Sequence, residues 1–246
     1  MLSIANLTKR YGRALAVDDL TLTAAPGEVL ALLGPNGAGK TPTIRCITGL
    51  AQPTSGTIRV AGHDTLAAPQ AAKSAVGFVP DRAWFYPKVT ARELLRYVAG
   101  VRRQAAPNAR IEELLLRFKL AEHADSLTES YSHGMRQRLA FCVALLGEPQ
   151  LFITDEPMVG LDVQGHREVK TLFRELSAAG RTVVLTTHTL AVAEEVADRV
   201  AVVNHGRLVA QGTMAELRAL TKQSSTATLE DLFLRLTADD QAQQPA

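Results

Sequence analysis

The segment that most constrains the fold of this chain is GPNGAGKT at residues 34–41, which fits the phosphate-binding pattern G-x-x-x-x-G-K-[ST]. Glycines in this pattern let successive backbone N–H groups converge on phosphate oxygens at a helix N-terminus, whose dipole favours anions. Lys40 is expected to reach the β- and γ-phosphates of a nucleotide, and the Thr41 hydroxyl to ligate Mg²⁺. The plainer interpretation is a glycine-rich turn that binds nothing. The residues predicted to contact the nucleotide here are Gly34, Pro35, Asn36, Gly37, Ala38, Gly39, Lys40, Thr41 and Pro42.

Four short apolar runs end at residues that could take part in chemistry, and one of them leads directly into this loop. Short buried strands bounded by turns or helices indicate a parallel α/β sheet, which binds its ligands at the carboxyl ends of the strands. A strand before the loop and a helix containing Ile44 after it favour nucleotide binding over an empty turn. The runs are Val29–Leu33 before Gly34, Val76–Val79 before Pro80-Asp81, Leu151–Thr154 before Asp155-Glu156, and Thr182–Thr187 before His188.

Two carboxylates, Asp155 and Glu156, follow the run Leu151–Thr154. The first suits the Mg²⁺ shell, and the second can orient or deprotonate an attacking water. Alone, such a pair is more often a helix start or a surface pair, but a phosphate-binding loop upstream favours the functional interpretation. His188 follows a third predicted strand and could hydrogen-bond the γ-phosphate, although a lone histidine is usually structural.

Other segments predict structure around this sheet. Apolar alternation in Leu2–Leu7 and the run Gly56–Val60 suggest an antiparallel layer near the N-terminus. The residues between Thr90 and Gly147 change to a helical pattern, which starts with the capping box Thr90-x-x-Glu93. We interpret this stretch as an all-helical insertion. Its apolar positions at helical spacing are Leu94, Leu95, Val98 and Val101, then Ile111, Leu114, Leu115 and Phe118, and then Met135, Leu139, Val143 and Leu146 after Ser132.

The C-terminal part predicts one more helix and a polar tail. Thr228-x-x-Asp231 is a cap for a helix that carries Leu229, Leu232, Phe233 and Leu236, and residues 238–246 are expected to fray. We therefore predict an ATPase domain over residues 1–220, with its helical subdomain at about 82–147, and a C-terminal extension over 221–246.

Composition limits the classes of function. The 246 residues are 46% apolar and 21% charged with a net charge of +2, so we expect a globular core and no nucleic-acid partner. Cys46 and Cys142 lie far apart in apolar stretches and are expected to be core residues of a reduced, cytosolic protein. No apolar run approaches the roughly 18–20 residues of a membrane helix, and no signal-peptide pattern is present, so we expect a soluble chain.

The segment YSHGMRQR at residues 131–138 resembles L-S-G-G-Q-x-Q-R, the signature of the ATP-binding-cassette (ABC) transporter family, and it is predicted to start a helix. The resemblance to the nucleotide-binding subunit of these transporters covers essentially residues 2–220. Gly160-Leu161-Asp162 matches the family's D-loop, and His188 matches its switch histidine. Tyr11 lies where the family stacks an aromatic ring on adenine.

This resemblance implies the fold, the cofactors and the partners. The expected fold is a P-loop NTPase with a RecA-like parallel sheet core, an N-terminal antiparallel β subdomain and an inserted α-helical subdomain. Two cassettes are expected to pair head to tail with ATP and Mg²⁺ between them, and hydrolysis to move a membrane permease. The subunit is then expected at the cytoplasmic face of the cell membrane, held peripherally by that permease. Residues expected to contact the partner's ATP are Ser132, His133, Gly134 and Asp162.

The chain departs from the family pattern at Pro42, at Asp81 and, within the signature, at His133 and Met135. Pro42 replaces the Ser or Thr that offers its N–H or hydroxyl to the α-phosphate, which predicts weaker nucleotide binding without loss of folding. Asp81 stands at the position of the Q-loop glutamine, an Mg²⁺ ligand, and a carboxylate can still bind the metal. The predicted metal ligands are Thr41, Asp81 and Asp155.

Several segments resemble the exporter branch that energises separately encoded ABC-2 type membrane subunits. They are Pro80-Asp81, Phe85-Tyr86-Pro87, Thr90-x-x-Glu93 and the tail Thr228–Phe233. The aromatic run Trp84-Phe85-Tyr86 has two interpretations of similar weight. It either packs within the helical subdomain or forms a surface that receives a helix of the membrane subunit, because aromatic residues favour interfaces.

The leading hypothesis is therefore the ATPase subunit of an ABC exporter, and two alternatives remain. The first is a soluble ABC ATPase that acts on ribosomes or DNA. Such proteins usually have two cassettes in one chain, long coiled coils or zinc insertions, which this sequence lacks. The second is a nucleotide-binding regulatory module without useful turnover, which Pro42 keeps open although Lys40, Glu156, Asp162 and His188 are present.

Overall fold

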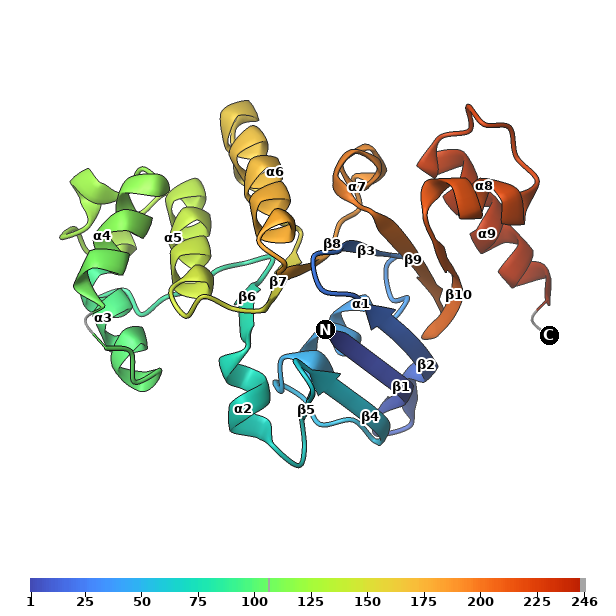
Figure 1. Cartoon of the computed structure of the whole chain (residues 1–246), viewed down its shortest axis with the longest axis horizontal. Helices are drawn as coiled ribbons and strands as arrows, with labels where there is room; N and C mark the ends of the chain where they lie inside the picture. The colour runs from blue at the N-terminus through green and yellow to red at the C-terminus, as the bar shows by residue number, and fades with distance from the viewer. Residues whose placement is uncertain (106, 244–246) are drawn as a thin grey trace.

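The computed structural model describes residues 1–105 and 107–243, and its central element is a six-stranded sheet (Figure 1). The strand order is β10-β9-β3-β8-β7-β6, with all neighbours parallel except β10, which runs antiparallel to β9. Alternate residues of β3 enter two different apolar cores, one on each face of the sheet. The strands are β3 (Val29–Leu33), β6 (Val76–Val79), β7 (Leu151–Asp155), β8 (Thr182–Thr186), β9 (Arg199–Asn204) and β10 (Arg207–Gly212).

The predicted parallel sheet is confirmed, with small differences at two strand ends. The strand predicted at Leu151–Thr154 includes Asp155, and the strand predicted to end at Thr187 ends at Thr186. Asp155 pairs with Thr186, so the first carboxylate still belongs to the sheet while Glu156 lies beyond it.

The predicted N-terminal antiparallel layer is a four-stranded sheet in the order β2-β1-β4-β5. Its apolar face, which includes Leu2, Ile4 and Ile58, shares a core with Leu30 and Leu32 of β3. The sequence patterns indicated β1 and β4 but missed β2. The strands are β1 (Leu2–Tyr11), β2 (Ala14–Ala24), β4 (Ser55–Val60) and β5 (His63–Asp64).

The segment with the helical pattern contains α3 (Ala91–Val101), α4 (Asn108–Arg117) and α5 (His133–Leu145), at one end of the molecule (Figure 1). The predicted capping box is present, since Thr90 Oγ1 accepts from the Glu93 N–H and Glu93 Oε2 from the Thr90 N–H. Helices α4 and α5 each end one residue before the last apolar position of their patterns. Short helical turns at Ala121–His123 and Thr128–Ser130 lead from α4 to α5.

A row of aromatic rings joins these helices to the sheet. Phe118 and Phe141 have ring centroids 5.6 Å apart, Phe141 and Phe152 6.1 Å, and Phe152 and Phe173 6.4 Å. The rings come in turn from the residue after α4, from α5, from β7 and from α6 (Val163–Ala178). Because one apolar core runs through both parts, the helical insertion is rigidly seated on the strand that ends at Asp155.

The remaining helices are α1 (Lys40–Ile47), α2 (Pro69–Ser74), α7 (Leu190–Val196), α8 (Met214–Thr221) and α9 (Leu229–Gln243). Thr228 and Asp231 cap α9 reciprocally, as predicted. The prediction of a frayed tail from residue 238 is wrong as far as Gln243, because α9 continues to that residue; residues 244–246 lie outside the described part. Cys46 and Cys142 are separate buried thiols. Within residues 1–105 and 107–243, no helix is long and apolar enough to cross a membrane.

Candidate nucleotide-binding and hydrolysis site

The loop at residues 34–41 connects β3 to α1 at the carboxyl end of a central strand, as predicted. Gly37 and Gly39 have φ values of 81° and 103°, a region that favours glycine. A Cβ on Gly39 would lie 2.7 Å from the Ala16 carbonyl oxygen, so a larger residue there would also clash. Gly39 is the N-cap of α1, whose first turn contains no acidic side chain. The N–H groups and dipole of this helix end are thereby available to an anion.

A cavity of about 350 Å³ lies against this loop and brings together three of the four predicted strand ends. The loop residues come from β3, Asp81 follows β6, and Asp155 and Glu156 lie at the end of β7. The carboxyl ends of adjacent parallel strands meet at one edge of the sheet, which explains why residues so distant in sequence share this space. The lining residues are Ala16, Asn36, Gly37, Ala38, Gly39, Lys40, Thr41, Pro42, Asp81, Asp155 and Glu156.

The ammonium group of Lys40 lies among acceptors. It donates to the carbonyl oxygens of Gly34 and, at 3.0 Å, of Pro35. Burial lowers the pKa of Lys40, and the negative charges of Glu156 and Asp155 act in the opposite direction. The carboxylates of Asp155 and Glu156 would repel the phosphate oxygens of a bound nucleotide. The positive charge of Lys40 beside them offsets this repulsion.

Asp155 is held by the neighbouring strand, because its Oδ1 accepts from the Thr186 hydroxyl. Burial raises the pKa of Asp155 above its usual range; the Thr186 bond opposes this, and Asp81 and Glu156 add to it. A bound cation would relieve the repulsion among these carboxylates. Asp81, Asp155 and the Thr41 hydroxyl offer only oxygen ligands, which fits Mg²⁺ held by one or two carboxylates together with phosphate oxygens. Among the described residues, no three His, Cys, Asp or Glu side chains form a metal group by themselves.

Glu156 lines this cavity and pairs with His188, which does not line it. The Glu156 backbone turns out of the strand with φ 51°, and its N–H donates to the Thr186 carbonyl at 3.1 Å. Its Oε2 lies 2.9 Å from His188 Nδ1. Because 75% of the His188 side chain is exposed while Glu156 is largely enclosed, the histidine presents the outer side of the pair. A carboxylate and an imidazole at this distance can hold a water and pass its proton.

The segment at residues 131–138 starts α5, as predicted, but it lies outside the phosphate cavity of its own chain. Ser132 is the N-cap, and its hydroxyl accepts from the Met135 N–H at 3.2 Å. Gly134 is needed for packing, since a Cβ there would lie 2.9 Å from the Gly160 carbonyl oxygen. Ser132 and His133 are exposed. The exposed start of α5 therefore sits beside the loop that carries Gly160.

Asp162 caps α6, the helix that follows this loop. Its Oδ1 accepts from the Gly165 N–H at 2.8 Å, and this bond is the largest cause of its lowered pKa. Arg138 of α5 lies 3.7 Å away. Asp162 is thus tied to the signature segment and, like Ser132, His133 and Gly134, does not line the phosphate cavity.

Comparison with known proteins shows which family has this site. The family described as ABC transporter matches residues 17–159. The chain belongs to the ABC transporter family. It is 39% identical over 222 residues to daunorubicin resistance ATP-binding protein DrrA3 of Streptomyces coeruleorubidus, covering 89% of this chain and 70% of that protein. It is 38% identical to Nod factor export ATP-binding protein I of Paraburkholderia xenovorans (strain LB400), covering 86% and 70%.

Solved structures agree with this assignment. An ATP-binding subunit of an ABC transporter superposes with a TM-score of 0.91 at 32% identity, covering 96% of this chain and 99% of that one. A dimeric, post-hydrolysis ATP-binding cassette with ADP and Pi has a TM-score of 0.80 at 24% identity, a likeness of fold. The predicted P-loop NTPase fold is confirmed, and the chain is an ATP-binding and ATP-hydrolysing subunit of this family.

Tyr11, the residue expected to stack on adenine, stands apart from the phosphate cavity of this ABC subunit. It ends β1 with 45% of its surface exposed, and Lys9 Nζ lies 4.7 Å from its ring centroid. It does not line the cavity, so an adenine-stacking role stays a prediction.

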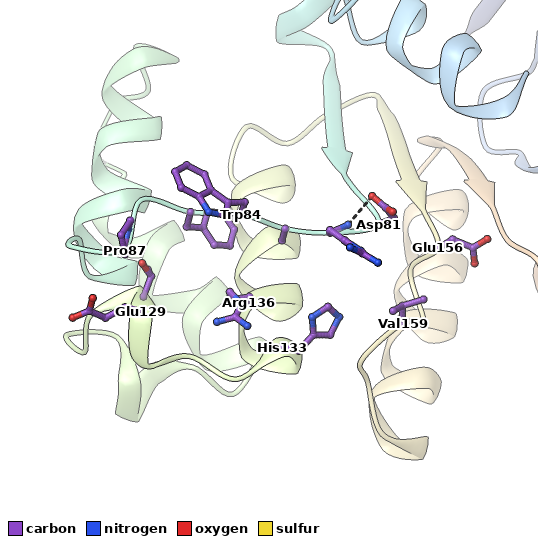
Figure 2. Close-up of a pocket in the computed structure, with 12 residues that line it drawn as sticks. Asp81, Trp84, Pro87, Glu129, His133, Arg136, Glu156 and Val159 are labelled. Carbon is purple, nitrogen blue, oxygen red and sulfur yellow. Dashed lines mark hydrogen bonds between the residues drawn. The ribbon is translucent and has the colours of Figure 1, made fainter. Parts of the chain in front are cut away.

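A second, larger cavity of about 740 Å³ opens beside the nucleotide site of the ABC subunit, between the segment after β6 and the start of α5 (Figure 2). Asp81 and Glu156 line both cavities. Trp84 is 79% exposed and Tyr86 60%, whereas Phe85 packs against the core. The aromatic run therefore fits both interpretations in part, because Phe85 is partly buried against the core while Trp84 and Tyr86 are exposed.

Two contacts of the site were missed in the sequence. The first is Thr186, whose hydroxyl donates to Asp155. It lies on a predicted strand two residues before His188, and this position could have indicated that it belongs to the site. Ala16 lines the phosphate cavity from β2, a strand that carried no recognised pattern.

Proposed function

We propose that this subunit energises an exporter, and that it hydrolyses ATP in a half-site which a second copy completes. The observation that carries the proposal is the convergence of Lys40, Asp155 and Glu156 on one cavity, with His188 paired to Glu156. One edge of the sheet then has a positive charge that can bind phosphates, oxygen ligands that can bind a cation, and a carboxylate that can act as a base on water.

Each residue has a distinct role in this proposal. The loop N–H groups and Lys40 bind the phosphates, and Glu156 orients or deprotonates the attacking water while His188 holds Glu156 from the exposed side. Thr41, Asp81 and Asp155 would hold Mg²⁺, which supplies Lewis-acid stabilisation of the phosphate oxygens when bound. Tyr11 would stack on the adenine.

The second half of the site would come from the partner copy in a head-to-tail dimer. Ser132, His133, Gly134 and Asp162 would meet the γ-phosphate from across the interface, and the exposure of Ser132 and His133 supports this. The N-terminus of α5, which has no acidic residue in its first turn, suits an anion. Binding of ATP would close the dimer, and loss of phosphate would release it.

The proposed membrane partner is an integral permease subunit that binds at the groove lined by Trp84. The exposed rings of Trp84 and Tyr86 support this, since aromatic residues at such surfaces favour interfaces. The names of the relatives, resistance and export proteins, support outward transport. The subunit would then lie at the cytoplasmic face of the membrane, held there by the permease, and its ATPase domain would be residues 1–220 with 221–246 as an extension.

Phosphate release by the wild type and by Glu156→Gln tests the enzyme against the regulatory module. Replacing the base with an amide is expected to reduce turnover by about 100-fold or more. Glu122→Gln, which changes an exposed acid absent from the linings of both cavities, is the matched control and should keep full turnover. Absence of turnover in every protein, with or without the membrane subunit, would favour a regulatory module.

A further inference from the structure

Helix α7 links the hydrolysis site to the C-terminal helices. It begins two residues after His188, and the turn between them is closed by the Thr189 N–H, which donates to Thr187 Oγ1 at 3.0 Å. The preceding strand β8 is buried along its length and paired on both sides. Because β8 is held by the sheet on both sides, the contacts of α7 determine where the chain runs after His188.

Glu194 of α7 connects this helix to both C-terminal helices. Its Oε2 accepts from the N–H of Leu229, the first residue of α9, at 3.0 Å. Its Oε1 lies 3.6 Å from Arg218 Nη2 of α8, and Arg218 Nε donates to the Ala227 carbonyl at 2.9 Å. The carboxylate therefore satisfies an N–H that α9 leaves without an intrahelical partner, and its charge suits that helix end.

Neighbouring contacts make this a fixed attachment. Val192, Ala193 and Val196 on the inner face of α7 are buried in the same core as Leu229 and Leu232 of α9. The adjacent residue Glu195 faces a different element, since it pairs with Lys170 and, at 3.7 Å, with Arg174 of α6. Two consecutive glutamates thus hold α7 from both sides.

We infer that Glu194 is a positioning residue for hydrolysis, which holds α7 against α8 and α9 and so sets the place of His188 beside Glu156. The inference rests on the proposed role of His188. With three quarters of its side chain exposed, His188 has little packing of its own, and its 2.9 Å approach to Glu156 depends on the chain on either side. The C-terminal segment becomes a support of the hydrolysis site rather than an appendage.

The expected effect of changing Glu194 is a fall in kcat without a change in ATP binding. Glu194→Ala frees the start of α9 and one side of α7, and misplacement of His188 is expected to lower kcat about tenfold. KM for ATP should stay within about twofold, because the phosphate-binding loop lies on other elements. Glu194→Gln keeps an oxygen that can accept the Leu229 N–H, so it should restore most of the turnover.

Steady-state phosphate release, measured over a range of ATP concentrations well below the melting temperature, tests the inference. Glu230→Ala is the matched control, because Glu230 is an exposed acid in the first turn of α9. Unchanged kcat in Glu194→Ala, or equal losses in Glu194→Ala and Glu230→Ala, would overturn the positioning role. His188→Ala separates the two proposals: if it keeps full turnover, the proposed role of His188 fails, whereas loss in His188→Ala with normal Glu194→Ala sinks only this inference.

Discussion

Helices α1 and α5 both begin at segments predicted to contact phosphate, but their first turns are finished differently. The N-cap of α1 is Gly39 in a left-handed conformation, and no side chain satisfies the N–H groups of that turn. The N-cap of α5 is Ser132, whose hydroxyl accepts from the Met135 N–H. Neither first turn contains an acidic residue, so both ends can face an anion.

Their surroundings differ as much as their caps. The start of α1 lies in a cavity with Lys40, Asp155 and Glu156, whereas the start of α5 presents Ser132 and His133 at the surface. The α1 end brings a lysine and two carboxylates together, whereas the α5 end has Arg136, whose Nη1 donates to the Tyr131 carbonyl, and no acidic residue in its first turn. This difference is what a site divided between two copies requires.

The largest expected effect comes from mixing two inactive variants. Lys40→Ala removes the charge at the α1 end, and Ser132→Arg blocks the α5 end, so each alone should lose turnover by about 100-fold. In a mixed dimer, one site combines the intact loop of one copy with the intact signature of the other. Phosphate release by the mixture should therefore clearly exceed that of either variant alone.

Thermal melting of each variant is the control for this experiment, because Ser132→Arg also removes a helix cap worth about 1 kcal/mol. If folded variants never complement each other at any mixing ratio, the divided site is wrong. If Ser132→Arg is fully active by itself, the signature takes no part in hydrolysis.

The next effect concerns the groove beside the α5 end. Trp84→Ala is expected to weaken assembly with the membrane subunit by about 30-fold, as loss of an aromatic hot spot does, while basal ATP hydrolysis is spared. Tyr97→Ala is the matched control, because Tyr97 is an aromatic residue of α3 that is 70% exposed but does not line the groove. Co-purification with the permease subunit measures the effect. If Trp84→Ala lowers the melting temperature together with assembly, the residue acts through folding and not through an interface.

The comparison also shows what sequence can predict. The α1 end was predictable almost completely, since the glycine pattern, Lys40 and the strand ends at Asp155 and Glu156 are local signals that parallel-sheet topology brings together. The α5 segment was predictable as a helix start, but not its contact with Gly160, which depends on how the helical insertion sits on the sheet.

Other features of the fold could not be predicted from short stretches of sequence. The two strands β9 and β10 and the strand β2 were missed, and Ala16 at the phosphate cavity was missed with them. The polar composition of residues 238–246 favours a frayed tail, but α9, whose buried face at Leu232 and Leu236 packs on the body of the protein, continues to Gln243. Such packing is a tertiary effect that propensity does not report.

A smaller effect is expected at Pro42, inside the α1 end. Pro42 lines the phosphate cavity, and Thr43 cannot replace the missing group because its hydroxyl is buried and donates to the Gly39 carbonyl at 2.8 Å. Pro42→Thr should tighten ATP binding about tenfold by adding a hydrogen bond to a charged phosphate. Pro42→Ala, which restores only the N–H, separates the backbone from the hydroxyl. An unchanged dissociation constant in both variants, measured by calorimetry, would remove Pro42 as a cause of weak binding.

The smallest effect concerns the attachment of the helical insertion, which contains α5, to the rest of the protein. Lys119, two residues beyond α4, pairs with Glu168 of α6 at the surface, whereas the rings of Phe118, Phe141 and Phe152 join the same parts inside. Because exposed ion pairs contribute little, Lys119→Gln should lower the free energy of unfolding by only about 0.5 kcal/mol, and by less at high salt. Lys222→Gln removes an exposed lysine at the end of α8 as a control for charge alone. If denaturant unfolding shows a loss of several kcal/mol for Lys119→Gln, the ion pair rather than the aromatic row holds the signature segment in place.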